Sequence, residues 1–514
     1  MIEDHDLDDL LRGATGELRG QVGNQSVPAF DPANHAGRNA AFAVALVALI
    51  AGAGWLFVLR DSNPTTLDVT NNPAQTGIEE PAPQTTPEVP DENTAGPTVP
   101  EESAPGPTVV EPDDAPTNST PQVQFDLSTP LPNQAPLELL TQSNDPVWNT
   151  PVQRLTAAGD GDGDGGVADG SRFHRIESHN RAVLDADGQQ ILAQRGDDWT
   201  IVDRETGEFT VLALNRGSEP NWHPTNPELI RHLAGENAST GDMVLLETRI
   251  DGTSETLVDL REELTTALPG ALYIHSSQLG APSADSNRYV WAVYNDAENV
   301  IGFVTYDLAS QEIVGLLEAV PTGELGVFDS VAMSKSGDSV VLAWADEMIV
   351  YDADFTNERR LGQGVSLYDL ASSANGDDVL ITTDLDSGRD SVGWVVTYNL
   401  DTGATTRLHD LFTEEAGNAS IDFSGAAIDR PGWVLASSYG CGDGTGWSCD
   451  RIMAWNVDDG TIVNLAHTYG CADSVFTEPR AVVNSDFTQG WFNTDFGSCG
   501  EDASVVEITI GPLE

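Results

Sequence analysis

A strand–turn–strand unit recurs along the last two-thirds of the chain and limits the possible folds more than any other feature. Each copy has an apolar or aromatic residue followed by Asp or Asn, then a short polar turn, then a second alternating strand. Five clear copies begin at Ile201, Thr305, Val350, Thr397 and Ala454, and two weaker ones at Glu247 and Val505. One such hairpin cannot bury its own apolar face, so the repeat predicts stacked copies.

The spacing of the copies indicates the kind of stack. Their turn positions, from residue 203 to residue 507, lie 45 to 57 residues apart, about the length of a four-stranded propeller blade. A second hairpin with a Gly or Asp turn precedes several copies and supplies the other two strands. It begins at Ala182, Val331 and Leu370. The sequence therefore predicts an all-β fold, a β-propeller of about seven four-stranded blades over residues 172–514. An open array of β-sandwich strands is the alternative.

The last blade is short of an outer strand when the chain ends soon after Ile510. We expect residues near Phe173 to Glu177 to complete it, because closing the ring removes exposed sheet edges.

The turns ETGE at 205–208 and DTG at 401–403 resemble those of bacterial extracytoplasmic propellers related to the TolB and YncE groups. The resemblance covers about residues 172–514 and implies the fold, not an activity. The chain departs from WD40 blades in having no repeated Trp-Asp pair. It also has no Trp closing each blade as quinone-binding propellers do, so we expect no quinone and predict no cofactor of this kind.

Residues 39–59 form an uncharged apolar run between Arg38 and Arg60. Its length suits a helix that crosses a bilayer core, so it predicts one transmembrane helix. A signal peptide is the alternative, but the run starts late and ends without a small-residue cleavage site. The nearby arginines favour a cytoplasmic amino terminus and an extracytoplasmic carboxyl-terminal domain at the cell membrane.

Residues 1–38 are predicted to be a short cytoplasmic segment with an amphipathic helix. Apolar residues recur there at helical spacing, at Leu7, Leu10, Leu11, Ala14 and Leu18. The helix either docks a cytoplasmic partner, which would make the chain a transmembrane sensor, or is solvated without one.

Residues 60–153 are predicted to be a disordered linker rich in Pro, Thr and Glu. From Asp61 to Gln153 there are 18 prolines and 15 acidic residues but no Lys or Arg. Such a segment buries too little apolar surface to fold. An Asp- and Gly-rich linker at 154–171 follows. We expect the whole spacer to hold the propeller away from the membrane.

Charge and the cysteines bear on partners and compartment. The chain has a formal net charge of −59 and a single lysine, Lys335, so nucleic acid is not expected as a partner.

All four cysteines lie beyond the apolar run, at Cys441, Cys449, Cys471 and Cys499. In an exported domain they favour two disulfides, most simply Cys441 to Cys449 and Cys471 to Cys499, although three pairings exist. A zinc site is the alternative, but no C-x-x-C spacing is present.

The loops that carry the cysteines are rich in glycine and aromatic residues. We predict that they lie on one face of the last two blades and present a rigid ligand-binding surface made by Tyr439, Trp447, Tyr469 and Phe496. The alternative is that these aromatic side chains cap the propeller core.

The segment DGDGDGGVAD from Asp160 is the candidate metal site, with carboxylates at Asp160, Asp162, Asp164 and Asp169. The pattern starts like a calcium-binding EF-hand loop, so calcium is the one cofactor it suggests. Ser171 stands where that loop needs a bidentate acid, and a flexible polar linker is the alternative.

Motifs for catalysis are mostly missing from the sequence. There is no G-x-S-x-G, no H-E-x-x-H and no phosphate-loop lysine. His223, in EPNWHPTNPELI, has a similarity to oligogalacturonate-lyase-type propellers, whose histidines bind metal, but a structural turn also explains it. The favoured function is a binding or scaffolding module for a protein or cell-envelope ligand. A sensor, and a lyase or hydrolase acting on polysaccharide, are the alternatives.

Overall fold

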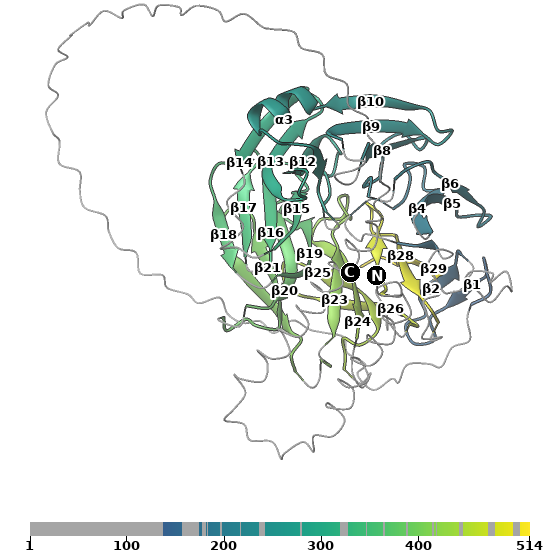
Figure 1. The fold of residues 1–514 in the computed structure, drawn as a ribbon. Coiled ribbons are helices and arrows are strands. Elements are labelled where there is room, and N and C mark those ends of the chain that lie inside the picture. The colour runs from purple at the N-terminus through teal and green to yellow at the C-terminus, as the bar shows by residue number, and fades with distance from the viewer. Residues whose placement is uncertain are drawn as a thin grey trace, which may run out of the picture. The chain divides into compact units, whose positions relative to one another are not determined.

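The computed structural model describes residues 137–513, with gaps at 157–173, 177–180, 182, 196–197, 216, 236–241, 278–279, 319–326, 346, 363–364, 387–388, 414–415, 418, 441–445, 471–477 and 497–503. The described residues form seven antiparallel sheets that follow one another as blades around a centre (Figure 1). The prediction of an all-β propeller of seven blades is confirmed. The predicted segments at 1–38 and 39–59 lie outside the described residues.

No helix within the described part of the chain is long and apolar enough to span a bilayer.

The first four blades use consecutive strands. Blade 1 contains β3 (His174–Arg175), β4 (Gln190–Arg195), β5 (Asp198–Asp203) and β6 (Phe209–Val211). Blade 2 contains β7 (Asn221–Trp222), β8 (Leu229–Leu233), β9 (Val244–Arg249) and β10 (Ser254–Asp259). Blade 3 contains β11 (Tyr273–His275), β12 (Arg288–Tyr294), β13 (Val300–Asp307) and β14 (Glu312–Glu318), and the helix α3 (Arg261–Ala267) precedes it. Blade 4 contains β15 (Phe328–Met333), β16 (Ser339–Trp344), β17 (Met348–Asp352) and β18 (Arg359–Gly362).

The last three blades include the one that closes the ring. Blade 5 contains β19 (Val365–Ser372), β20 (Asp378–Asp384), β21 (Trp394–Asn399) and β22 (Thr405–Asp410). Blade 6 contains β23 (Ser420–Ser424), β24 (Trp433–Tyr439), β25 (Arg451–Asn456) and β26 (Ile462–His467). Blade 7 contains β27 (Val482–Val483), β28 (Gln489–Thr494), β29 (Ser504–Thr509), β2 (Pro151–Arg154) and β1 (Gln142–Asn144).

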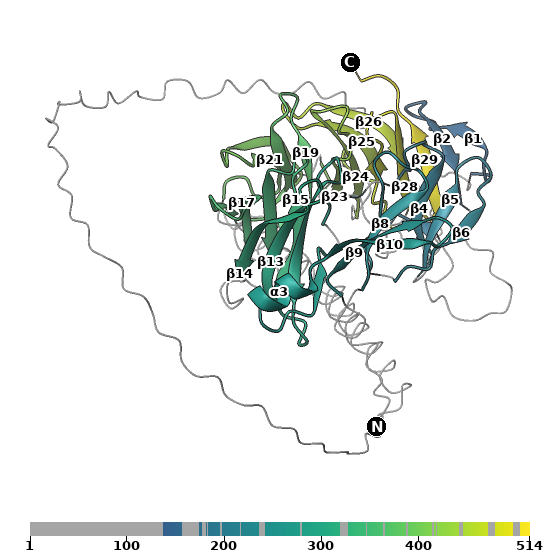
Figure 2. The same ribbon diagram turned by 90° about the horizontal axis from the view of Figure 1, so that it is seen from above.

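Ring closure uses a different segment from the one expected. β2 pairs with β29, so that Val152 lies opposite Ile508, and β1 adds a fifth strand outside β2. Figure 2 shows these two blue strands beside the yellow β29. The expectation that residues near Phe173 to Glu177 close the ring is wrong, because His174 and Arg175 form the first strand of blade 1 and pair with β4. The propeller thus includes residues 142–154, which the sequence assigned to the linker.

The repeated Asp or Asn caps the turn between the third and fourth strands of a blade. Asp203 Oδ1 accepts hydrogen bonds from the backbone N–H groups of residues 205 and 206, at 3.0 and 2.8 Å. In blades 5 and 6, Asn399 Oδ1 accepts the backbone N–H of residue 402, and Asn456 Oδ1 accepts those of residues 458 and 459. Gly207, Gly403 and Gly460 follow at φ of 70°, 68° and 75°, a backbone region that glycine enters without strain. The seventh predicted turn is wrong, since Glu507 lies inside β29, whose next partner comes from the amino-terminal side.

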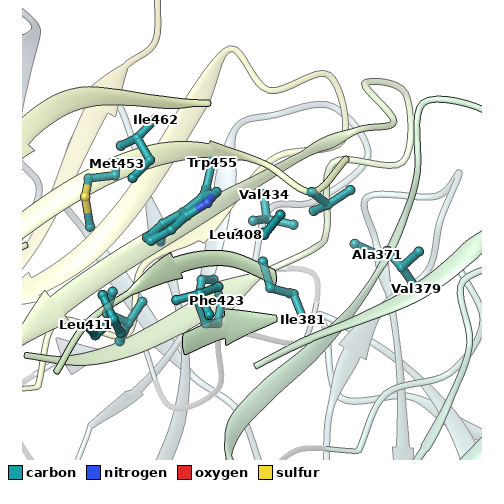
Figure 3. Packing of buried hydrophobic residues seen from close by; sticks show 14 of the residues in the cluster. Ala371, Val379, Ile381, Leu408, Leu411, Phe423, Val434, Met453, Trp455 and Ile462 are labelled. Carbon is teal, nitrogen blue, oxygen red and sulfur yellow. The ribbon is translucent and has the colours of Figure 1, made fainter. Parts of the chain in front are cut away.

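The core consists of seven apolar clusters, one in each seam between neighbouring blades. Side chains alternate along each strand, so one face of a blade packs on the blade before it and the other face on the blade after it. Figure 3 shows the seam between blades 5 and 6, where Phe423 and Trp455 meet edge to face with ring centroids 5.9 Å apart. Each blade is therefore held by both of its neighbours.

Candidate functional site on the loop face of blades 6 and 7

Three connections of blades 6 and 7 leave the same end of the blades, because the strands alternate in direction. They span residues 440–450 between β24 and β25, 468–481 between the two blades, and 495–503 between β28 and β29. We call this end the loop face. Cys449 is disulfide-bonded. The cysteines that lie outside the described residues are Cys441, Cys471 and Cys499, so the pairing stays a prediction.

Asp422 on β23 is a buried carboxyl group with a relative exposure of 1%, and the Tyr439 hydroxyl is the hydrogen-bonding side chain that acts on it. Burial, and after it the negative charge of Glu478, raise the pKa of Asp422 to about 8, while Arg480 and the nearby Tyr439 hydroxyl act in the opposite direction. The carboxyl group is therefore mostly protonated at neutral pH.

Tyr439, the last residue of β24, is buried beside this carboxyl group. Burial, and then the charge of Asp422, raise the pKa of the Tyr439 hydroxyl well above its usual range. The predicted ligand contact is thus part of a closed polar cluster. A protonated acid next to a phenol can hold and exchange a proton, which is the kind of chemistry that shifted pKa values mark in functional sites.

The segment that covers Asp422 is tied to three blades. Arg480 pairs with Glu478 through Nη2 and Oε2 at 3.1 Å. Asn493 of blade 7 donates to the carbonyl oxygens of Glu478 and Ile176, the second of which lies in blade 1. The Ala481 N–H donates to the Ser437 hydroxyl of blade 6 at 3.0 Å. These bonds hold residues 478–481 in place at the base of the loop face.

Trp447 anchors the connection that carries Cys449. Its relative exposure is 6%, and its ring lies 6.1 Å from Trp455 and 5.7 Å from His409 in the seam between blades 5 and 6. The adjacent Ser448 hydroxyl donates to the Ala416 carbonyl oxygen at 2.6 Å. Trp447 therefore packs in the core and does not present its ring to solvent.

Asp145, in the segment between β1 and β2, fastens that segment to blade 6. Its Oδ1 accepts the N–H groups of Val147 and Trp148, and its Oδ2 accepts the N–H and Nδ1–H of His467 and the hydroxyl of Tyr469. Burial alone would raise the pKa of Asp145, but the bonds from His467 and Tyr469, and then those from the backbone, lower it to about 2. The carboxylate stays ionised over the ordinary pH range.

Two half-buried aromatic side chains contact the ring of the buried His467. The Trp148 ring lies 4.3 Å from the His467 ring, and the Tyr469 ring lies 5.8 Å from it. The Arg451 guanidinium lies 5.1 Å from the Trp148 ring centroid. We call Trp148, His467 and Tyr469 the Trp148–Tyr469 group. Tyr469 has a φ of 55°, a region that bulky residues rarely occupy and that recurs at functional sites.

Phe496 lies in the connection between β28 and β29 and is half-buried. The Arg154 guanidinium lies 5.2 Å from its ring centroid, and Arg154 also bonds the Ser504 hydroxyl at 3.0 Å. Phe496 and Tyr469 pack against the cluster between blades 6 and 7, whereas Trp447 belongs to the cluster between blades 5 and 6. The structure therefore places three of the four predicted aromatic residues in two different seams, and the fourth, Tyr439, beside Asp422.

Asp145, Trp148 and Asp422 were missed by reasoning from the sequence. Trp148 carries a usable signal, because it is the first aromatic residue after a long stretch that holds only Phe125. An isolated tryptophan at the end of a Pro-rich segment indicates that ordered chain begins there. Asp422 carries no such signal, because polar and apolar residues alternate in its segment SIDFS as they do in any half-exposed strand.

His223 is a turn residue. Its Nδ1 accepts the N–H groups of Thr225 and Asn226, at 3.2 and 3.1 Å, in the turn between β7 and β8. Side chains that accept backbone N–H groups in the same turn of other blades are Asp185, Ser283, Ser334, Ser373 and Asn484. Burial, and then the charge of Arg231, lower the pKa of His223. Capping of this turn explains why a histidine stands at position 223.

Lys335 also has a structural place. Its side chain is 8% exposed and its Nζ lies 3.8 Å from Asp369 Oδ1. Asp369 accepts the N–H groups of Gly425 and Leu370 at 2.6 and 2.7 Å, so the lysine of blade 4 is tied to blades 5 and 6. Burial raises the pKa of Asp369 and Lys335 opposes that shift.

Within the described ranges, no group of three or more His, Cys, Asp or Glu side chains is placed to hold a metal ion. The candidate calcium ligands are Asp160, Asp162, Asp164 and Asp169, and all of them lie outside the described residues.

The fold and the loop face define a seven-bladed β-propeller with an elaborated pair of final blades. No protein-family model matches the sequence, and no curated protein does. Among solved structures, an oligogalacturonate lyase in complex with manganese matches at 12% identity over 72% of this chain and 96% of that one, with a TM-score of 0.49. TolB from Acinetobacter baumannii matches at 12% identity over 62% and 77%, with a TM-score of 0.31.

The WD40 domain of Pan2 from Neurospora crassa matches at 8% identity over 66% of this chain and 90% of that one, with a TM-score of 0.39. The order and pairing of the seven sheets define the propeller, and the TolB and WD40 structures are what the chain is similar to.

Proposed function

We propose that the chain is a binding or scaffolding propeller, held outside the cell by a single-pass membrane anchor at residues 39–59, that engages a protein or cell-envelope ligand through its loop face. The observation that supports this function is the Trp148–Tyr469 group. It places two half-buried aromatic rings at the surface of a rigid ring of blades.

Aromatic side chains on a rigid support are the usual centres of binding energy at protein interfaces, because they bury a large area and lose little conformational entropy. Asp145 provides the support here, since it holds His467 and Tyr469 on one side and the Trp148 backbone on the other. The seven seams keep blade 6 and blade 7 in register below it. A ligand would therefore meet a surface that needs little ordering on binding.

The anchor and the spacer support the location. An uncharged run of bilayer length followed by a long acidic, Pro-rich segment is typical of a domain held away from a membrane. The disulfide bond of Cys449 fits an oxidising, extracytoplasmic compartment.

Photo-crosslinking in cells tests the binding site. A photo-reactive phenylalanine analogue is placed at the exposed Pro146, beside the Trp148–Tyr469 group, in the full chain in its own cells. We expect a higher-mass adduct that disappears on Trp148→Ala. A matched control is Phe412→Ala, because Phe412 is an exposed aromatic residue, 41% exposed, in the connection between blades 5 and 6. An adduct that both variants leave unchanged, or no adduct, would contradict the proposed site.

The location has its own test. A membrane-impermeant biotinylation reagent that reacts with carboxyl groups should label the propeller in intact cells, because exposed acids such as Glu205 and Asp458 are plentiful. Labelling only after the cells are opened would contradict the extracytoplasmic location.

A further inference from the structure

The proposed ligand site is assembled from two distant parts of the chain. Trp148 lies in the connection between β1 and β2, whereas His467 and Tyr469 lie at the end of blade 6. Asp145, in the same connection as Trp148, accepts hydrogen bonds from both blade 6 residues. The Trp148 ring lies 4.3 Å from the His467 ring. The Trp148–Tyr469 group therefore exists only while residues 145–150 lie against blade 6.

The amino-terminal side of this connection is held by a weak edge strand. β1 is the outermost strand of blade 7 and pairs with β2 alone, at three residue pairs. All three of its side chains are exposed, so β1 adds little apolar burial. Before it, Leu137 and Leu140 bond to Arg154 through their backbones, and Leu139 is 46% exposed. An edge strand with so few bonds can open locally while the rest of the fold stays intact.

The carboxyl-terminal side of the connection is held more firmly. β2 pairs with β29, and just beyond it the Leu155 N–H donates to the Val505 carbonyl oxygen at 2.9 Å. Val152 and Leu155 have relative exposures of 1% and 0% and belong to the apolar clusters on the two sides of blade 7. Returning such side chains to water costs far more than moving exposed polar ones. We therefore expect β2 to stay in place when β1 leaves.

We propose that tension on the chain ahead of Leu137 detaches residues 137–150 and thereby dismantles the Trp148–Tyr469 group, while the ring of blades stays closed. This rests on the proposed function, in which the membrane anchors the chain ahead of β1 and the loop face holds the ligand. Along the chain the load reaches β1 first, then Asp145 and Trp148, and β2 last. Pulling would therefore release the ligand without opening the ring.

Asp145 makes this release an all-or-none event. Its Oδ1 accepts the backbone N–H of Trp148, while its Oδ2 accepts the backbone N–H of His467, so one carboxylate both shapes the connection and fastens it to blade 6. The side chain is almost fully buried when docked. A position in which the carboxylate has left its donors but is still shielded from water is unfavourable. The connection is therefore either docked or free.

Single-molecule force spectroscopy on the full chain in detergent tests the proposal. One DNA handle is joined to a peptide tag inserted in the spacer after Asn72, and the other to a tag after Glu514. Freeing residues 137–150 lengthens the chain by at most about 50 Å, because an extended residue spans at most about 3.6 Å. We expect this short, reversible extension first, at a lower force than the much longer extensions of the blades.

Variants show whether the short extension is the release of this segment. Asp145→Asn should raise the open fraction at a given force at least about tenfold, because the donors from blade 6 lose a charged acceptor. Tyr469→Phe removes one of these donors and should raise the open fraction by less. The matched control is Asp377→Asn, an exposed acid in the turn after β19, which should leave it unchanged. Unchanged later extensions show that the blades of each variant have stayed folded.

Two results would overturn the proposal. A first extension much longer than that of residues 137–150 would mean that blade 7 opens together with β2. A short first extension that Asp145→Asn leaves unchanged would place the opening elsewhere in the chain. The force measurement contains no ligand, so its outcome is independent of the crosslinking test at Pro146. A normal short extension without any crosslinked adduct would contradict the proposed binding site alone.

Discussion

The substitution Asp422→Asn should make the stability of the propeller less sensitive to pH. Asp422 has a pKa of about 8 in the folded chain, against an ordinary value of 3.8. The folded state therefore keeps the proton over a range in which the unfolded state has released it. The free energy of unfolding of the wild type falls as the pH rises from about 4 to about 8, and the contribution of this group then levels off. Asparagine cannot ionise and lacks this dependence.

The magnitude follows from the shift. Each pH unit between the two pKa values is equivalent to about 1.4 kcal/mol, so the full effect is about 6 kcal/mol. Between pH 5 and pH 8 the stability of Asp422→Asn relative to the wild type should rise by about 4 kcal/mol. The side chain is almost fully buried, so solvent screening removes little of this difference.

Urea denaturation followed by tryptophan fluorescence measures the difference at pH 5, 6.5 and 8 and at constant ionic strength. The matched control is Asp377→Asn, because Asp377 is an exposed carboxyl group in the turn that follows β19. That control should show a constant difference from the wild type. A constant difference for Asp422→Asn as well, or one that shrinks as the pH rises, would refute the account of a buried, protonated acid.

Three further substitutions or reactions test other contacts. Lys335, buried against Asp369, should react with an amine-directed reagent only after unfolding, as measured on its peptide by mass spectrometry; rapid labelling of the folded chain would contradict that burial. Asp145→Asn should lower the unfolding free energy by about 2 kcal/mol near pH 7, because the donors from His467 lose a charged acceptor. That advantage of the wild type should fade as the pH falls from about 4 through about 2, and an advantage that persists at pH 2 would argue against the low pKa of Asp145. His223→Ala should cost about 1 kcal/mol in a thermal unfolding scan and His223→Asn much less, whereas equal losses would contradict the turn-capping role.

The residues within each repeated turn were enough to predict most of these turns. Asp203, Asn399 and Asn456 accept the backbone N–H groups of their own turns, and a glycine with positive φ follows each of them. A few adjacent residues specify such a turn, so the sequence shows it directly. The blade count followed because the turns recur about one blade length apart.

Ring closure could not be predicted in the same way. β2 has four residues and begins at Pro151, and β1 has three exposed polar ones, so neither shows the alternation that marks a strand. Their conformation depends on pairing with β29, far along the chain. The surrounding proline-rich composition concealed them.

The site depended on packing that one strand cannot reveal. Trp447 is buried because Trp455 and His409 of neighbouring strands receive its ring. The sequence correctly placed the three loops at one end of two blades. It could not distinguish an aromatic side chain that anchors a loop from one that faces solvent, because that depends on the neighbouring blade.

The pairing of β2 with β29 has a consequence for how the chain folds. Val152 is synthesised early, but its pairing partner Ile508 is synthesised near the end. The two parts of the blade 7 sheet therefore leave the ribosome at the start and at the end of propeller synthesis. Bringing them together costs the loop-closure entropy of nearly the whole domain and makes this the slowest kind of contact to form. Until then both strands have open edges on which another chain can pair. A chain that stops before Ser504 should therefore aggregate or be degraded, even though six of its blades are complete.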